Sequence, residues 1–375
     1  MSLSVLQRQY RSVCAFGAAA VIVGVGMVAL PALPAHAATF GAYTVTSFAA
    51  TGSESHPDDV TRLGDYIYVT YQNGVGPDGA VAPSGATAST IQQYRLDGTP
   101  GASWQVTGKV DGLTADPAGN RLLVTTNEDA NSSFHTLTPG AATPLVNYTY
   151  VGLNHGGGTD AISILNGTIL VSASAPATVG GANAATYSVQ LSGTNANLTQ
   201  VIADDSTATA INGPKAGTSV PLALSDPDSN LVVPASVPAY GGDFLLDGQA
   251  DQQLIFSAST GAPNQSLTVL SVTQPLDDTV FATTAAPVLW VTDPSHNTLD
   301  RATGPFAPGE VVTSVAPNAG PTYLATVNLS TGAVAPITDL SSINPKGLLF
   351  TTAAVAAPVP AAPATPVTGS ASFTG

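Results

Sequence analysis

Pairs of short β-type segments recur along this chain, and this recurrence is the feature that most restricts its fold. Each pair has a run rich in small residues, a tight turn, and then a run rich in Val, Ile, Leu and Thr. Five pairs begin at Asp58, Asp111, Asp160, Val220 and Asp277, and a shorter echo, PKGLLFTT, begins at Pro345. Hairpin-like segments separate the pairs, and the periodicity of an amphipathic helix is missing after the N-terminal segment. The sequence therefore predicts an all-β, repetitive fold.

The interval between repeats, about 50 to 70 residues, accommodates four short strands, which is typical of a β-propeller blade. The strand rich in small residues would lie innermost, where blades crowd a central channel. We predict six blades, with five or seven as alternatives and two β-sandwich domains as the competing architecture. The sixth repeat is incomplete, and the alternating segment Phe40–Ala49 is predicted to help close the ring.

Within the fourth repeat, DPDSN (Asp226–Asn230) imitates the first residues of an EF-hand loop. Leu231 and Val237 stand where that loop needs Gly and Glu, which argues against the motif. The segment also aligns with DPAGN (Asp116–Asn120), and it is therefore predicted to be a turn between two strands of a blade.

The N-terminal segment has the features of a bacterial export signal. Arg8 and Arg11 precede an apolar run, Val13–Pro34, and Ala35–Ala37 is an A-x-A cleavage site. The alternative is an uncleaved membrane anchor. Cys14 is the one cysteine, so the mature chain would contain no disulfide.

Three regions follow from these observations: a signal peptide (1–37), a propeller domain (38–352) and a disordered tail rich in Pro and Ala (353–375). We expect a secreted or cell-envelope protein of a bacterium. Loss of Arg8 and Arg11 with the signal leaves seven basic against 24 acidic residues, a net charge of −17. That charge disfavours nucleic acid and anionic membrane surfaces as partners. A small molecule, a glycan or an envelope protein remains as a partner.

One repeat, VDGLTADPAGNRLLVT (110–125), together with NPKGLLFTT (344–352), resembles secreted bacterial β-propellers of the NHL, gluconolactonase and streptogramin-lyase group. This resemblance implies a propeller whose relatives include metal-dependent lactonases, a metal-dependent lyase and pure binding platforms. The lactonase pattern has an early Glu, two Asn and a late Asp. Glu54 and Asp278 could stand for the first and the last, but neither lies in a matching motif.

Four aspartates, Asp59, Asp111, Asp160 and Asp278, stand at the starts of predicted inner strands. In a propeller they would form a ring at one mouth of the channel. Their mutual repulsion would favour a bound cation, with Ca²⁺ the natural candidate for carboxylate ligands. The alternative is that each aspartate accepts hydrogen bonds from backbone N–H groups of a turn.

The motif His155-Gly156-Gly157-Gly158 suggests the oxyanion hole of an esterase, but the mature chain has no G-x-S-x-G nucleophile motif. The glycines are better explained as the segment that leads into a blade. His155 and His56 occupy comparable positions before two inner strands, and either could ligate a metal or transfer a proton. The alternative for both is a hydrogen bond to the backbone of a loop.

The loop 125–133 concentrates Asn127, Glu128 and Asp129, which could form part of a pocket or a solvated turn. Three function classes remain. The first is a binding platform with a cation in its channel. The second is a metal-assisted lactone hydrolase or lyase, with Asp59, Asp160 and Asp278 holding the metal and His155 or His56 moving a proton. The third is a structural envelope protein. The hydrolase requires the histidines and aspartates to converge in one channel mouth.

Overall fold

The computed structural model describes residues 36–50, 52–175 and 180–352. This part contains 27 β-strands and one short 3-10 helix, η1 (Thr338–Leu340). No helix among the described residues is long and apolar enough to span a bilayer. The predicted tail and residues 1–35 of the predicted signal peptide lie outside the described residues. The first strand, β1 (His36–Phe40), begins two residues before the predicted mature start at Ala38.

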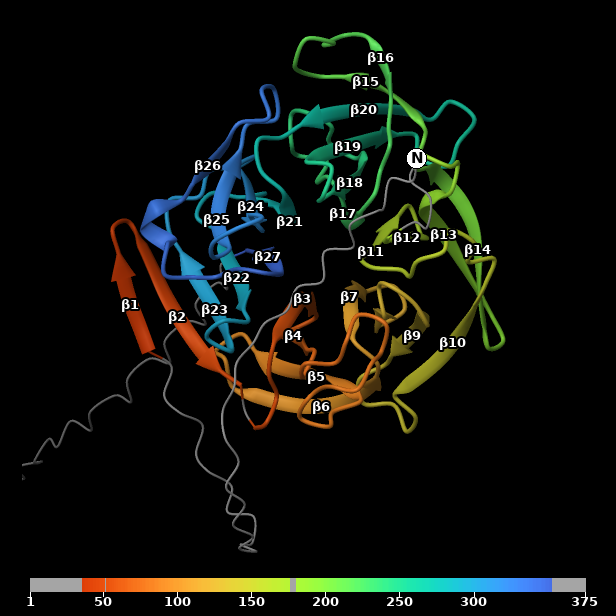
Figure 1. Cartoon of the computed structure of the whole chain (residues 1–375). Coiled ribbons are helices and arrows are strands. Elements are labelled where there is room, and N and C mark those ends of the chain that lie inside the picture. The colour runs from red at the N-terminus through yellow and green to blue at the C-terminus, as the bar shows by residue number, and fades with distance from the viewer. Residues whose placement is uncertain (1–35, 51, 176–179, 353–375) are drawn as a thin grey trace, which may run out of the picture. The chain divides into compact units, whose positions relative to one another are not determined.

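Most strands form radial units, which we call blades and name by their innermost strand (Figure 1). The β3 blade contains β3 (Pro57–Leu63), β4 (Tyr66–Tyr71), β5 (Ala88–Arg95) and β6 (Pro100–Thr107). The β7 blade contains β7 (Val110–Asp116), β8 (Arg121–Thr126), β9 (Ser133–Leu137) and β10 (Leu145–Val151). The β11 blade contains β11 (Ile162–Leu165), β12 (Thr168–Ser172), β13 (Ala184–Ser192) and β14 (Asn195–Ala203).

The β17 blade contains β17 (Pro227–Val232), β18 (Phe244–Gly248), β19 (Gln253–Ala258) and β20 (Ser266–Ser271), and a hairpin of β15 (Thr207–Ala210) and β16 (Ser219–Pro221) extends it. The β21 blade contains β21 (Leu276–Phe281), β24 (Val311–Val315), β25 (Tyr323–Val327) and β26 (Val334–Pro336). The β27 blade contains β27 (Leu348–Thr351), β22 (Val288–Asp293), β23 (Thr298–Thr303), β2 (Tyr43–Ala49) and β1.

The inner strands contact one another in turn, from β3 through β7, β11, β17, β21 and β27 back to β3. They surround one central space (Figure 1). Neighbouring strands of the β3 blade pair antiparallel, whereas β15 extends the β17 blade by pairing parallel to β20. The prediction of an all-β propeller is confirmed.

Small residues lie where inner strands approach one another, as the repeat pattern predicted. A Cβ atom on Gly112 would lie 2.4 Å from the carbonyl oxygen of Asp160, and one on Gly347 would lie 2.4 Å from that of Asp58. Neither position could hold a side chain without movement of the backbone. The small residues therefore permit the close packing that closes the channel wall.

Both ends of the described chain contribute to the β27 blade, which closes the ring. β2 pairs with β23, so the prediction that Phe40–Ala49 helps to close the ring is confirmed. The ring of Phe48 on β2 stacks on Trp290 of β22 at a centroid distance of 6.2 Å. Both side chains belong to a buried cluster shared with β3 and β4, which joins the last blade to the first.

The predicted pairing of the repeat at Asp277 was wrong. Its two runs became β21 and β22, but β21 pairs with β24, while β22 pairs with β23 and β27. All six residues of β22 are buried. A fully buried strand needs a partner on each edge, and β27, more than 50 residues downstream, supplies one of them. The β21 and β27 blades are thus interlaced, which local pairing rules cannot reveal.

The register of the fourth repeat was also predicted wrongly. Pro227–Val232 is the inner strand β17, so most of the segment expected to be a turn lines the channel instead. The cause is a turn signal, Asp-Pro-Asp-Ser-Asn, placed at the start of a strand. A bulge between Pro227 and Asn230 reconciles these turn-forming residues with the ladder to β18.

Candidate functional site

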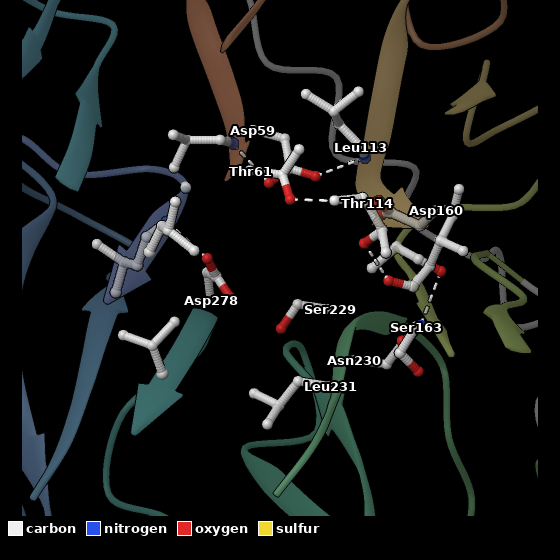
Figure 2. Close-up of a pocket in the computed structure, with 18 of the residues that line it drawn as sticks. Asp59, Thr61, Leu113, Thr114, Asp160, Ser163, Ser229, Asn230, Leu231 and Asp278 are labelled. Atoms are coloured by element: carbon white, nitrogen blue, oxygen red, sulfur yellow. Dashed lines mark hydrogen bonds between the residues drawn. The ribbon is translucent and has the colours of Figure 1, made fainter. Parts of the chain in front are cut away.

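The central space of the propeller contains a cavity of about 580 Å³, lined by residues from β3, β7, β11, β17, β21 and β27. Figure 2 shows Asp59, Asp160 and Asp278, which come from different blades, around the same opening. Because each inner strand begins at the same level of the ring, residues at equivalent repeat positions meet there. The cavity volume suits a small molecule or a hydrated ion.

At or just before the start of each inner strand, one equivalent position per blade carries a charged residue that lines the cavity. In chain order these residues are Asp58, Asp111, Asp160, Asp228, Asp277 and Lys346. We call this set the charged ring. The repeat thus provides an aspartate five times and a lysine once.

Two lysines neutralise part of the charged ring. Lys346 Nζ lies 2.6 Å from Asp277 Oδ1 and 3.9 Å from Asp58 Oδ1. Lys109 Nζ lies 2.7 Å from Asp111 Oδ1 and also contacts Glu128 Oε1. Burial alone would lower the pKa of Lys346, but the carboxylates of Asp277 and Asp58 hold it well above its ordinary value. Both lysines therefore remain charged.

Glutamines at the ends of second strands position two of the ring carboxylates. Gln72, directly after β4, donates to Asp111 Oδ1 at 3.3 Å, and Gln249, directly after β18, donates to Asp277 Oδ1 at 2.8 Å. In both cases the glutamine belongs to the preceding blade. The same device thus recurs at two places of the ring and fixes its geometry.

Two ring aspartates, Asp160 and Asp228, form a carboxylate cluster together with Glu128. One oxygen from each lies within 4.8 Å of the other two. Among the described residues, Asp160 and Asp228 have no lysine or arginine within ion-pair distance. Within the cluster, Lys109 compensates Glu128, whereas the charges of Asp160 and Asp228 have no ion-pair partner among the described residues.

The pKa values of the cluster reflect this imbalance. Burial, reinforced by the charge of Glu128, raises the pKa of Asp160 to about 7. Burial and the neighbouring Asp160 raise the pKa of Asp228 well above its ordinary value, and the two carboxyls hydrogen-bond to each other. Burial alone would also raise the pKa of Glu128, but the charges of Lys109 and Lys346 hold it below its ordinary value. Asp160 and Asp228 thus share a proton near neutral pH.

Asp59 and Asp278, two of the predicted metal ligands, lie one residue beyond the charged ring and contact backbone. Asp59 Oδ2 accepts a hydrogen bond from Leu113 N at 2.6 Å (Figure 2). Asp278 Oδ2 accepts one from Leu348 N at 2.7 Å. In each case the other oxygen accepts from the next residue of its own strand. Both therefore join adjacent inner strands, and their cross-strand donors belong to β7 and β27 and not to a turn as in the structural alternative.

The other two predicted ligands, Asp111 and Asp160, belong to the charged ring. The structure brings them into one cavity with Glu128. Asp111 is held by Lys109 and Gln72, and it also accepts a hydrogen bond from Glu128 N at 3.2 Å. Asp160 alone of the four predicted ligands belongs to the carboxylate cluster.

The predicted convergence of histidines on this site was wrong. His155 is buried away from the cavity lining: its Nε2 lies 2.9 Å from Ser174 O and its Nδ1 lies 3.2 Å from Tyr187 Oη. His56 is exposed, has a φ of 58° and contacts Ser55 Oγ at 3.1 Å. The described residues that line the cavity include no histidine. The glycines after His155 allow close packing: a Cβ on Gly158 would lie 2.2 Å from Asn127 O.

Of the predicted pocket residues on the loop 125–133, one lines the cavity. Glu128 does so, while Asn127 Oδ1 accepts a hydrogen bond from Lys109 N at 2.9 Å and thereby shapes the loop. Asp129 lies outside the lining, and its N–H donates to Pro77 O at 3.1 Å.

Sequence reasoning missed Asp58, Asp228, Asp277 and Lys346. Asp58 and Asp277 stand in the doublets Asp58-Asp59 and Asp277-Asp278, of which only the second member was predicted as a metal ligand, although both members line the cavity. Asp228 was hidden by the misassigned turn. Lys346 stands in PKGLL where another repeat has PDDV, so an alignment of prolines Pro57, Pro227 and Pro345 would have found it.

No family model matches this sequence, and no curated protein is significantly similar to it. Solved structures with a similar fold include the periplasmic gluconolactonase PpgL of Pseudomonas aeruginosa (TM-score 0.44, 13% identity, covering 84% of this chain and 96% of that one). A candidate 6-phosphogluconolactonase from Bacteroides uniformis has a TM-score of 0.43 and 10% identity, and covers 82% and 94%.

The β-propeller domain of Cps50 (Swd1) from Myceliophthora thermophila has a TM-score of 0.39 and 10% identity, and covers 76% and 96%. All three similarities are to proteins that share 13% or less of their sequence with this chain.

Proposed function

We propose that this chain is an exported binding protein that holds a divalent cation, Ca²⁺ by preference, in its central cavity. The observation that carries the proposal is the carboxylate cluster, in which oxygens of Glu128, Asp160 and Asp228 lie within 4.8 Å of one another. Oxygens on opposite sides of a Ca²⁺ ion stand about 4.6 to 5.2 Å apart, twice the Ca–O bond length. The spacing and the ligand type therefore fit this ion.

Electrostatics supports the same conclusion. Without a cation, Asp160 and Asp228 reduce their repulsion by sharing a proton, which is why their pKa values are raised. A divalent cation would replace that proton and stabilise both charged carboxylates. The cavity of about 580 Å³ leaves space beside the ion for a small polar molecule, such as a saccharide, to complete the coordination.

The test is a titration of purified protein with CaCl₂, MgCl₂ and MnCl₂ after treatment with a chelator, followed by thermal unfolding and calorimetry. At 100 times the dissociation constant, the ion should stabilise the protein by about 2.7 kcal/mol and raise Tm by several degrees. Asp228→Asn should need at least ten times as much ion as the wild type for the same rise in Tm. Asp65→Asn, which removes the same charge at the exposed turn after β3, is the matched control and should leave it intact. A Tm unaffected by every divalent ion would refute the proposal.

A metal-assisted lactone hydrolase is the second candidate, and one observation favours it. The pKa of Asp160, about 7, suits a carboxyl that transfers protons at neutral pH. Its histidine-based form is not supported, since His155 and His56 lie outside the lining. Hydrolysis of gluconolactone with Ca²⁺, measured for the wild type and Asp160→Asn, separates the candidates. The binding function predicts equal background rates for both.

A further inference from the structure

Lys346 occupies the position of the charged ring that the other five blades give to aspartate. It follows Pro345 as Asp58 follows Pro57 and Asp228 follows Pro227. It precedes Gly347, whose missing side chain lets β27 approach Asp58. The β27 blade thus places an ammonium group at the ring position where the other blades place a carboxylate.

The contacts of Lys346 show what the substitution does. Its Nζ lies 2.6 Å from Asp277 Oδ1 and 3.9 Å from Asp58 Oδ1, and these two aspartates are its neighbours in the ring on either side. Asp277 receives a second hydrogen bond from Gln249, so its carboxylate is fixed toward the lysine. An ammonium group is therefore seated between two carboxylates of adjacent blades.

The other half of the ring differs. Asp160 and Asp228 are also ring neighbours, with carboxylate oxygens within 4.8 Å of each other, but among the described residues no lysine forms an ion pair with either. The ring therefore has one acidic pair filled by the chain itself and one that is open to a cation from solution. Lys109 fills neither pair, because it binds Asp111 and Glu128.

We infer that Lys346 is a built-in occupant of a second cation site, and that it limits the cavity to one divalent ion. This inference rests on the proposed function for the ion at the carboxylate cluster. Removal of the ammonium would leave Asp58 and Asp277 facing each other without a counter-ion, which is the arrangement that a divalent cation neutralises. It would also remove a like charge from the cavity, so the first ion should bind more tightly.

The experiment measures the number of Ca²⁺ ions bound per chain, by equilibrium dialysis and calorimetry, for the wild type and Lys346→Gln. We expect one ion for the wild type and two for Lys346→Gln. Lys346→Arg, which keeps the charge, and Lys215→Gln, in an exposed loop, should each bind one. The double variant Lys346→Gln/Asp277→Asn should return to one ion, because the second site has lost a carboxylate.

The outcomes separate the two proposals. One ion in both the wild type and Lys346→Gln refutes the role of Lys346 and leaves the proposed function standing. No ion in the wild type refutes the proposed function; one ion in Lys346→Gln then still supports the role of Lys346, and none overturns it. If Lys346→Gln unfolds, it should refold in millimolar CaCl₂, and failure to do so overturns the inference.

Discussion

The shared proton of the carboxylate cluster makes a quantitative prediction about stability and pH. Burial raises the pKa of Asp160 to about 7, and the side chain is 6% exposed. An aspartate in an unfolded chain has a pKa of about 3.9. The folded protein therefore holds this proton about three pKa units more tightly, which corresponds to about 4 kcal/mol.

The sign follows from which state binds the proton. Between pH 4 and 7 the folded chain is protonated at Asp160 and the unfolded chain is not, so rising pH favours unfolding. The contribution is complete below pH 4 and is lost as the pH passes through 7. From pH 5 to pH 7.5, the free energy of unfolding of the ion-free protein should fall by about 2.5 kcal/mol on account of Asp160.

Urea unfolding in a chelator, at half-unit steps from pH 5 to pH 7.5, measures this decline. Asp160→Asn has no proton to lose at this position, so its decline should be smaller by about 2.5 kcal/mol. Asp65→Asn should decline as the wild type does. Saturating Ca²⁺ should also flatten the wild-type curve, because the ion stabilises the charged carboxylates. Equal declines for the wild type and Asp160→Asn would refute the assignment of the shared proton.

Three further predictions concern the architecture, and urea unfolding measures each. Gly112→Ala should cost about 1–3 kcal/mol, because its Cβ would meet the carbonyl oxygen of Asp160; unchanged stability would contradict this close approach. Trp290→Ala should cost about 3–5 kcal/mol, because the side chain is 1% exposed between the last and first blades, and a loss below 1 kcal/mol would contradict its place in the core. His155→Ala should cost about 1–3 kcal/mol through the lost contact with Ser174 and leave Ca²⁺ affinity unchanged; weaker ion binding would restore His155 as a candidate site residue.

The repeats were enough to predict much of the fold. Alternating small and apolar runs at a regular interval indicate strands, and their recurrence indicates blades whose first strands surround a channel. The closing strand from Phe40–Ala49 was also visible, because its alternation requires a sheet partner. The interlacing of β21 and β22 was not, because the partner of β22 comes from the distant β27.

The candidate site was predicted in place but not in detail. β7 and β11 each have a single acid at or just before their start, Asp111 and Asp160, and both proved to be ring residues. In the doublets Asp58-Asp59 and Asp277-Asp278, both residues line the cavity, but a shift of one residue changes which carboxylate pairs with Lys346 and which bonds to the adjacent strand. Sequence periodicity cannot select between neighbours, whereas the register of the folded strand does.

Short-range patterning along the chain was enough to predict a β-propeller with acidic residues at the starts of its inner strands. The folded ring was needed to show which acids converge, which of them Lys109 and Lys346 neutralise, and that His155 and His56 lie outside the cavity lining. Charge compensation depends on distances between side chains of different blades, and those distances exist only once the ring has closed.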